Sequence, residues 1–237
     1  MPWQDEDDSK ETVARAIERR RGRGEALEPV VPQAKGSKLA QHFWGIAWQH
    51  HLETYADYHS RLPKSRTMLR QGKVMDLTIA EGEITSVVAG TALHDVIVKI
   101  APLDPESWVE LRAACKGRVG SLLDLLSGSL GDEVMKIVSS PEHCLFPDRR
   151  DIRILCDCTD ESDLCPHGAA TLYAAGLRFD ANPELFFKLR AVNAVELVDE
   201  ASRSLEATAS CRENSAVIPA DDLSAVFGIE ISEIPSP

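Results

Sequence analysis

Ile152-Arg153-Ile154-Leu155-Cys156-Asp157-Cys158 is followed, after a six-residue gap, by Cys165-Pro166-His167 and then by the small-residue run Gly168 to Gly176. Polar and apolar residues alternate in the first segment, which predicts a strand that carries both of its cysteines on one side. The proline suits the first turn of a helix, and the last glycine would end that helix. We therefore expect a strand, a loop and a helix start to converge on one point.

Four side chains at this point, Cys156, Cys158, Cys165 and His167, are candidate ligands of one structural zinc ion. Three thiolates and one imidazole complete a tetrahedral shell and leave no open position for a reactive water, which argues against hydrolysis. Two alternatives remain at this stage: scattered core thiols near a surface histidine, and a redox pair of the first two cysteines. The redox pair is disfavoured because a one-residue spacer is poor geometry for a disulfide.

Cys-x-Cys, a short loop and Cys-x-His before a small-residue helix resemble the SWIM zinc finger, and the four ligand positions of that family match the four candidates above. The resemblance to full-length bacterial SWIM proteins extends from about residue 40 to the C-terminus. It includes the helix around Trp44 and Trp48, the segment Arg61-Leu62-Pro63-Lys64-Ser65-Arg66, and Leu145-Phe146-Pro147. The resemblance implies a zinc-binding module for DNA or protein partners, often encoded beside helicase-like ATPases of the chromatin-remodelling type.

Two features depart from the family pattern. Family members often carry an aromatic residue in the ligand loop and a basic residue before the ligand histidine. This chain has Thr159-Asp160-Glu161-Ser162-Asp163-Leu164 and Pro166 at these places. From Cys156 to the C-terminus, fifteen acidic residues stand against five basic ones, a charge of about −10 that repels a polyanion. A protein partner therefore suits the finger better than nucleic acid does.

Four regions are expected along the chain. Residues 1–38 have few apolar side chains and read as a disordered charged tail, with a transient helix at Lys10 to Arg20. The acidic part, 179–237, is expected to form helices, including Val195 to Leu205, that pack on the finger at 151–178. Residues 39–150 would form the α+β part of the globular region.

Within 39–150, the period-two pattern from Lys73 to Ile100 predicts a small antiparallel β-meander of three or four strands. Surrounding helices are predicted from Asp104 to a stop at Gly117, over Leu122 to Leu126 and over Asp132 to Val138. The predicted fold class is α+β, a meander with surrounding helices and a ββα-like SWIM finger.

Function is predicted as a non-catalytic adaptor for a protein partner, with a helicase-like ATPase as one candidate. The net charge of −12, the lack of a membrane-spanning run and a start unlike a signal peptide favour a cytoplasmic protein. Phosphate-binding loops and nucleophile motifs are missing, so no enzyme is predicted. The alternative is nucleic-acid binding by a basic patch. Its members are Arg61, Lys64, Arg66, Arg70 and Lys73.

Overall fold

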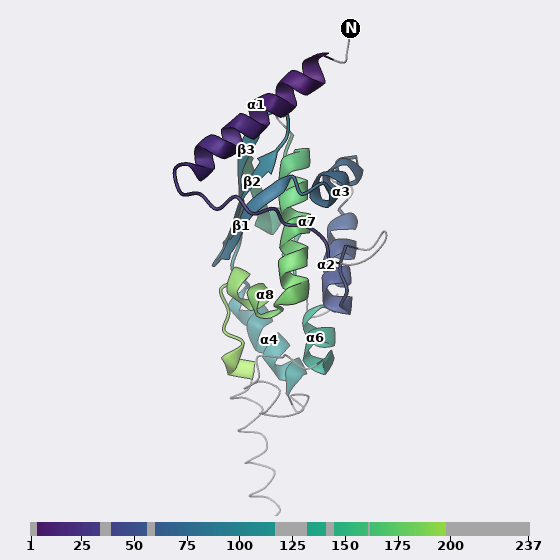
Figure 1. The fold of residues 1–237 in the computed structure, drawn as a ribbon. Coiled ribbons are helices and arrows are strands. Elements are labelled where there is room, and N and C mark those ends of the chain that lie inside the picture. Colours follow the sequence, from purple (N-terminus) through teal and green to yellow (C-terminus); the bar gives the residue numbers. More distant parts are fainter. Residues whose placement is uncertain are drawn as a thin grey trace, which may run out of the picture.

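A four-stranded antiparallel sheet organises the protein, seen here in a computed structural model (Figure 1). The structure describes residues 4–33, 39–55, 60–116, 132–140, 145–160 and 162–197. The strands are β1 (Val74–Ala80), β2 (Glu83–Ala89), β3 (Leu93–Ile100) and β4 (Ile152–Cys156), in that spatial order. The first three form the predicted meander, and the fourth joins from the cysteine-containing segment. The α+β class is therefore confirmed.

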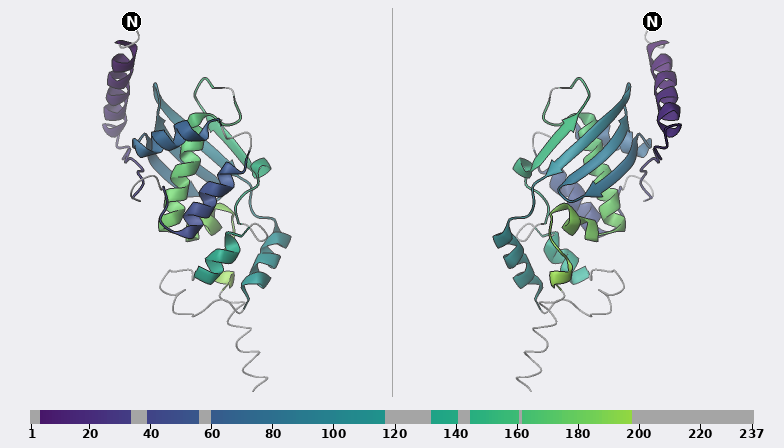
Figure 2. Two further views of the ribbon diagram at one scale, coloured as in Figure 1. Left: turned by 90° about the vertical axis from the view of Figure 1, so that its right-hand side faces the viewer. Right: turned by 90° about the vertical axis from the view of Figure 1, so that its left-hand side faces the viewer.

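One face of the sheet is covered by helix α7 (Pro166–Ala181), which runs along it beside α2 (Phe43–Glu53) and α3 (Leu62–Arg70) (Figures 1 and 2). Strand residues of alternate positions, such as Ile84 and Val98, are buried on this face. The apolar side chains of the sheet and of α7 therefore form the main core.

Gly176 does not end α7, contrary to the expectation from the sequence. The helix continues to Ala181, and the indole of Trp48 lies against Gly176. A Cβ atom at this position would stand 2.6 Å from Trp48 Cδ1, so only glycine admits the ring. The indole Nε1 also donates to Leu172 O at 2.9 Å. Gly176 therefore allows α2 and α7 to pack closely against each other.

Three short helices gather at the C-terminal end of α7: α4 (Pro105–Cys115), α6 (Asp132–Val138) and α8 (Glu184–Leu189) (Figure 1). The Asp104 side chain caps α4 by accepting from Ser107 N at 3.0 Å, as an N-cap aspartate does. The predicted helices after Asp104 and over Asp132 to Val138 are confirmed. Gly117 and Leu122 to Leu126 lie outside the described residues.

The N-terminal segment differs from the expected disordered tail. Residues 4–21 form α1 (Gln4–Arg21), which packs against one end of the other face of the sheet (Figures 1 and 2). Val13 and Ile17, one helical turn apart, pack on a second small core around the buried Leu27. Val30 N donates to Val74 O at 2.8 Å, so this segment also lies along the edge of β1. The low apolar content of residues 1–38 as a whole predicted disorder, although these few apolar residues have the spacing of one helix face.

The C-terminal part does not cover the finger within the described residues. Helix α8 lies at the far end of α7, where Gly82 N donates to Leu189 O at 3.0 Å. Val195 to Leu205 is described only as far as the buried Leu197. The rest of 198–237 lies outside the described residues. No helix in the described part of the chain has the length and apolar character needed to cross a bilayer.

Candidate metal centre

The four predicted ligands converge at the N-terminal end of α7. Cys156 ends β4, Cys158 follows in a bend, Cys165 is the N-cap residue of α7, and His167 lies in its first turn. Their ligand atoms all lie within 4.8 Å of one another. Cys158 lies beyond the strand, so β4 itself carries one thiol and not the predicted two. The convergence predicted from the spacing is confirmed, and this cluster could hold one metal ion.

Interatomic distances test whether a tetrahedral ion fits. Zinc lies about 2.3 Å from a thiolate and about 2.0 Å from an imidazole nitrogen, so neighbouring S and N ligands stand about 3.6 Å apart. The observed distance from Cys156 Sγ to His167 Nδ1 is 3.8 Å. This distance agrees with a shared ion, and the other ligand atoms lie within the 4.8 Å that encloses the group.

Close packing of α7 on β4 sets this geometry. A Cβ atom at Gly168 would lie 2.6 Å from Ile154 Cγ2, so a larger residue would push the helix start away from the strand. The Cys165 thiol accepts from Gly168 N at 3.3 Å, which caps the helix with a group that also faces the cluster. Gly168 therefore allows the start of α7 to lie close against β4.

Helix α3 braces the ligand segment from the other side. The buried Ser65 Oγ donates to Pro166 O at 2.9 Å, immediately before His167. Arg61 Nη1 lies 3.1 Å from Asp160 Oδ2, which ties the ligand loop to α3. Hydrogen bonds from Ser162, together with the Arg61 charge, lower the pKa of the Asp160 carboxyl. These contacts give Arg61 and Ser65 a positioning role that the sequence did not reveal.

Burial sets the protonation of the ligands. It raises the pKa of the Cys156 and Cys165 thiols, and the neighbouring Cys158 thiol contributes to both increases. Burial, then the charges of His94 and Lys64, lowers the pKa of His167 to about 4. Near neutral pH the imidazole is therefore neutral and ready to ligate, whereas these two thiols stay protonated until a cation displaces their protons.

Metal binding at neutral pH is therefore expected to release protons from the thiols but none from His167. Because protons compete for the thiolates, metal affinity should fall as the pH is lowered. Calorimetric titration with zinc in buffers of different ionisation enthalpy measures the protons released. The variant His167→Cys keeps four ligands and should release one additional proton. Equal proton release by the variant and the original chain would contradict this assignment.

Sequence reasoning missed His94, which lies beside the centre. Its Nδ1 is 3.0 Å from Asp157 Oδ1, and its ring lies 4.2 Å from the His167 ring, centroid to centroid. A second group of possible metal ligands, His94, Cys156 and Asp157, overlaps the first group at Cys156. His94 can be placed only from the pairing of β3 with β4. Val96 pairs with Cys156, and His94, two residues before Val96, lies on the same face of the sheet.

Gly90 leaves room for the His167 ring. A Cβ atom there would stand 2.5 Å from His167 Nε2. Gly90→Ala is therefore expected to displace the imidazole and to lower metal affinity about 10- to 100-fold, the range seen for groups that orient a ligand. Competition with a chelator of known affinity measures the loss. Thr91→Ala, at an exposed position of the same turn, is the control and should keep the original affinity.

Some residues of the predicted basic patch are held by contacts within the protein. Arg61 pairs with Asp160, and Arg66 pairs with Glu53 and donates from Nε to Tyr173 Oη at 3.1 Å. Lys64 and Arg70 are exposed on α3, and Lys73 is half-buried after it. Arg61 and Arg66 are thus held in intramolecular ion pairs.

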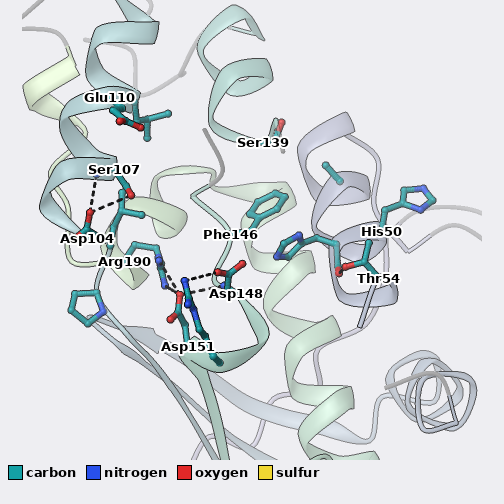
Figure 3. A pocket seen from close by; sticks show the side chains of 16 residues that line it. His50, Thr54, Asp104, Ser107, Glu110, Ser139, Phe146, Asp148, Asp151 and Arg190 are labelled. Carbon is teal, nitrogen blue, oxygen red and sulfur yellow. Dashed lines mark hydrogen bonds and ion pairs between the residues drawn. The ribbon is translucent and has the colours of Figure 1, made fainter. Parts of the chain in front are cut away.

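A separate cavity of about 820 Å³ opens near the other end of the molecule, between α2, α4 and the segment before β4 (Figure 3). His50 and Asp104 line it, and Arg190 closes one wall by pairing with Asp151. Arg190 Nη1 also donates to Ala101 O at 2.7 Å. None of the four candidate metal ligands lines this cavity, so it is distinct from the centre.

Comparison with known proteins adds one relative. No protein-family model and no solved structure matches the chain. The uncharacterized protein Rv2102 of Mycobacterium tuberculosis is 26% identical over 148 residues, which are 61% of this chain and 53% of that protein. The match therefore spans about half the length of that relative.

Proposed function

We propose that the chain is a SWIM-type zinc finger protein that binds one structural Zn²⁺ through Cys156, Cys158, Cys165 and His167. The observation that carries the proposal is the approach of these four ligand atoms to within 4.8 Å. Thiolate and imidazole ligands in a tetrahedral arrangement favour zinc over magnesium or calcium, which prefer oxygen.

The zinc serves structure and not catalysis in this proposal. Four protein ligands close the shell, so no position remains for a water to be activated. Instead, the ion joins the end of β4 to the start of α7 and fixes the loop between them, in which Asp157, Thr159, Ser162 and Asp163 are exposed. Such a loop, held by Arg61 and the metal, is a rigid surface for recognition.

A protein is the partner that the charges support. The chain carries a net charge of −12, and the candidate phosphate-binding side chains of Arg61 and Arg66 are paired internally. An adaptor for a protein, with a helicase-like ATPase as the class that the SWIM resemblance suggests, agrees with both features. Nucleic-acid binding through the exposed Lys64 and Arg70 is the second candidate.

Two measurements test the proposal. Elemental analysis gives the zinc content of the purified protein, and a tagged form of the chain captures its partner proteins. We expect one zinc per chain and a set of captured proteins that is lost when His167 is replaced. Protein without stoichiometric zinc, or the same captured set with the His167 variant, contradicts it. Binding to DNA or RNA that weakens steeply with salt, and is lost in Lys64→Ala/Arg70→Ala, would favour the second candidate.

A further inference from the structure

A second group of possible metal ligands adjoins the proposed zinc centre. It consists of His94, Cys156 and Asp157, whose ligand atoms all lie within 4.8 Å of one another. Cys156 belongs to both groups, whereas His94 and Asp157 take no part in the shell of the structural ion. The structural zinc therefore does not explain why these two side chains lie beside it.

The local backbone brings the three side chains together. Along a regular strand, successive side chains point to opposite faces, so Asp157 would point away from Cys156. Strand β4 ends at Cys156, and in the bend that follows Asp157 Oδ1 lies 3.0 Å from His94 Nδ1. His94 reaches the same place from β3, since Val96 pairs with Cys156. Two neighbouring segments thus supply the three ligands.

The distance between His94 and Asp157 suits an ion as well as a hydrogen bond. Nitrogen and oxygen ligands lie about 2.0–2.2 Å from a tetrahedral zinc and therefore stand about 3.3–3.6 Å apart, close to the 3.0 Å observed. Asp157, whose side chain is 54% exposed, can make the small adjustment. An ion would replace the proton on His94 Nδ1, and the neutral ring would carry its proton on Nε2 instead.

Charge favours a second cation beside the first. Three thiolates and a neutral imidazole around Zn²⁺ leave a charge of about −1, and the Asp157 carboxylate increases this to about −2. A second divalent ion would neutralise the whole group. The guanidinium of Arg20 interacts electrostatically with Asp157 but donates its hydrogen bonds to Asp95, so it does not replace such an ion.

The second position is open to solvent. A groove of about 400 Å³ is lined by Cys156 and Asp157, which gives an ion a path of entry. Three protein ligands leave one tetrahedral position for water, unlike the closed shell of the structural ion. An ion bound there should therefore exchange more readily than the structural zinc.

We infer that His94, Asp157 and Cys156 bind a second, exchangeable zinc ion, and that the Cys156 thiolate bridges the two ions. A thiolate sulfur has more than one lone pair, and mixed nitrogen, oxygen and sulfur ligands suit zinc and its substitutes cobalt and cadmium. This inference rests on the proposed structural centre, because the bridging thiolate belongs to that centre. The chain then holds one zinc firmly and a second only where free zinc is abundant.

Equilibrium dialysis of the full chain without an affinity tag, followed by elemental analysis, counts the ions. Dialysis against zinc-free buffer should leave one zinc per chain, and dialysis against buffer with excess zinc should leave two. The bridge is tested by replacing zinc with the NMR-active isotope of cadmium. The spectrum should contain two cadmium resonances that split each other through the shared sulfur of Cys156.

His94→Gln and Asp157→Asn each remove one ligand with little change in size. Each variant should bind one ion in place of two in excess zinc. Asp163→Asn is the matched control, because Asp163 lies in the same loop with its side chain 90% exposed but belongs to neither ligand group. This control should still bind two ions.

Several outcomes overturn the inference. They are one ion per original chain in excess zinc, two ions in either ligand variant, or two cadmium resonances that do not split each other. Loss of the second ion in Asp163→Asn would show attraction by general negative charge, and loss of both ions in His94→Gln would assign His94 to the structural centre; either result also overturns it. A chain with a single zinc that depends on His167 overturns this inference alone, whereas a chain without zinc overturns the proposed function as well.

Discussion

Replacement of His167 or Cys165 by alanine is expected to abolish stoichiometric metal binding and to lower the free energy of unfolding by about 4 kcal/mol. That value corresponds to the loss of a ligand present at about 1,000 times its dissociation constant. The loss should be large because binding free energy at such centres is coupled to folding. Elemental analysis and chemical denaturation of the two variants measure both effects.

Cys115→Ala is the matched control for this experiment. Cys115 is also a buried cysteine, but it lies on α4, far along the molecule from the start of α7. Its replacement should retain the metal, so a chelator should destabilise this variant as much as the original chain, whereas it should not affect the His167 and Cys165 variants. If the His167 and Cys165 variants kept their metal and their stability, the cluster would not be a metal centre.

Trp48→Ala is expected to destabilise the fold by about 3–5 kcal/mol, the usual loss for a large buried aromatic side chain. Trp48 is fully buried, packs edge-on against Phe146 and Phe179, and donates to Leu172 O. Its removal leaves a cavity between α2 and α7 and loses the hydrogen bond to Leu172 O. Thermal unfolding should shift downward by roughly 10 °C for a chain of this length.

The folded fraction of the Trp48 variant should nevertheless bind metal with unchanged stoichiometry, because the indole lies beside Gly176, more than two helical turns from His167. Phe43→Ala removes a 36% exposed aromatic from the same helix and should cost less than about 1 kcal/mol. Metal loss in Trp48→Ala under conditions that keep it folded would show that the core and the centre are more tightly coupled than their separation suggests.

The metal ligands could be predicted from the sequence because their spacing is local. Cys156 and His167 are joined by a short loop between two elements whose patterns are clear. His94 could not be predicted, since its place beside His167 depends on the register of β3 with β4, two strands separated by more than fifty residues. Arg61 and Ser65 were likewise hidden, because their partners belong to distant segments.

The helix boundaries show a similar limit. Asp104 followed by proline marked the start of α4 because an N-cap acts within its own turn. Gly176 misled the prediction since glycine is selected both for helix ends and for close approach of an aromatic ring, and only the position of Trp48 distinguishes the two. The sequence indicated a transient helix at Lys10 to Arg20, within α1, but its packing could not be predicted, because it depends on a sheet face that is formed elsewhere in the chain.

The four candidate ligands all lie within one twelve-residue segment, and the elements that flank it are β4 and α7. The entropy lost on closing so short a loop is small compared with that for bringing β3 and β4 together across the intervening chain. A cation that binds early in refolding would therefore join β4 to α7 before either element packs on the meander. Fewer contacts between distant residues would then remain to be formed independently.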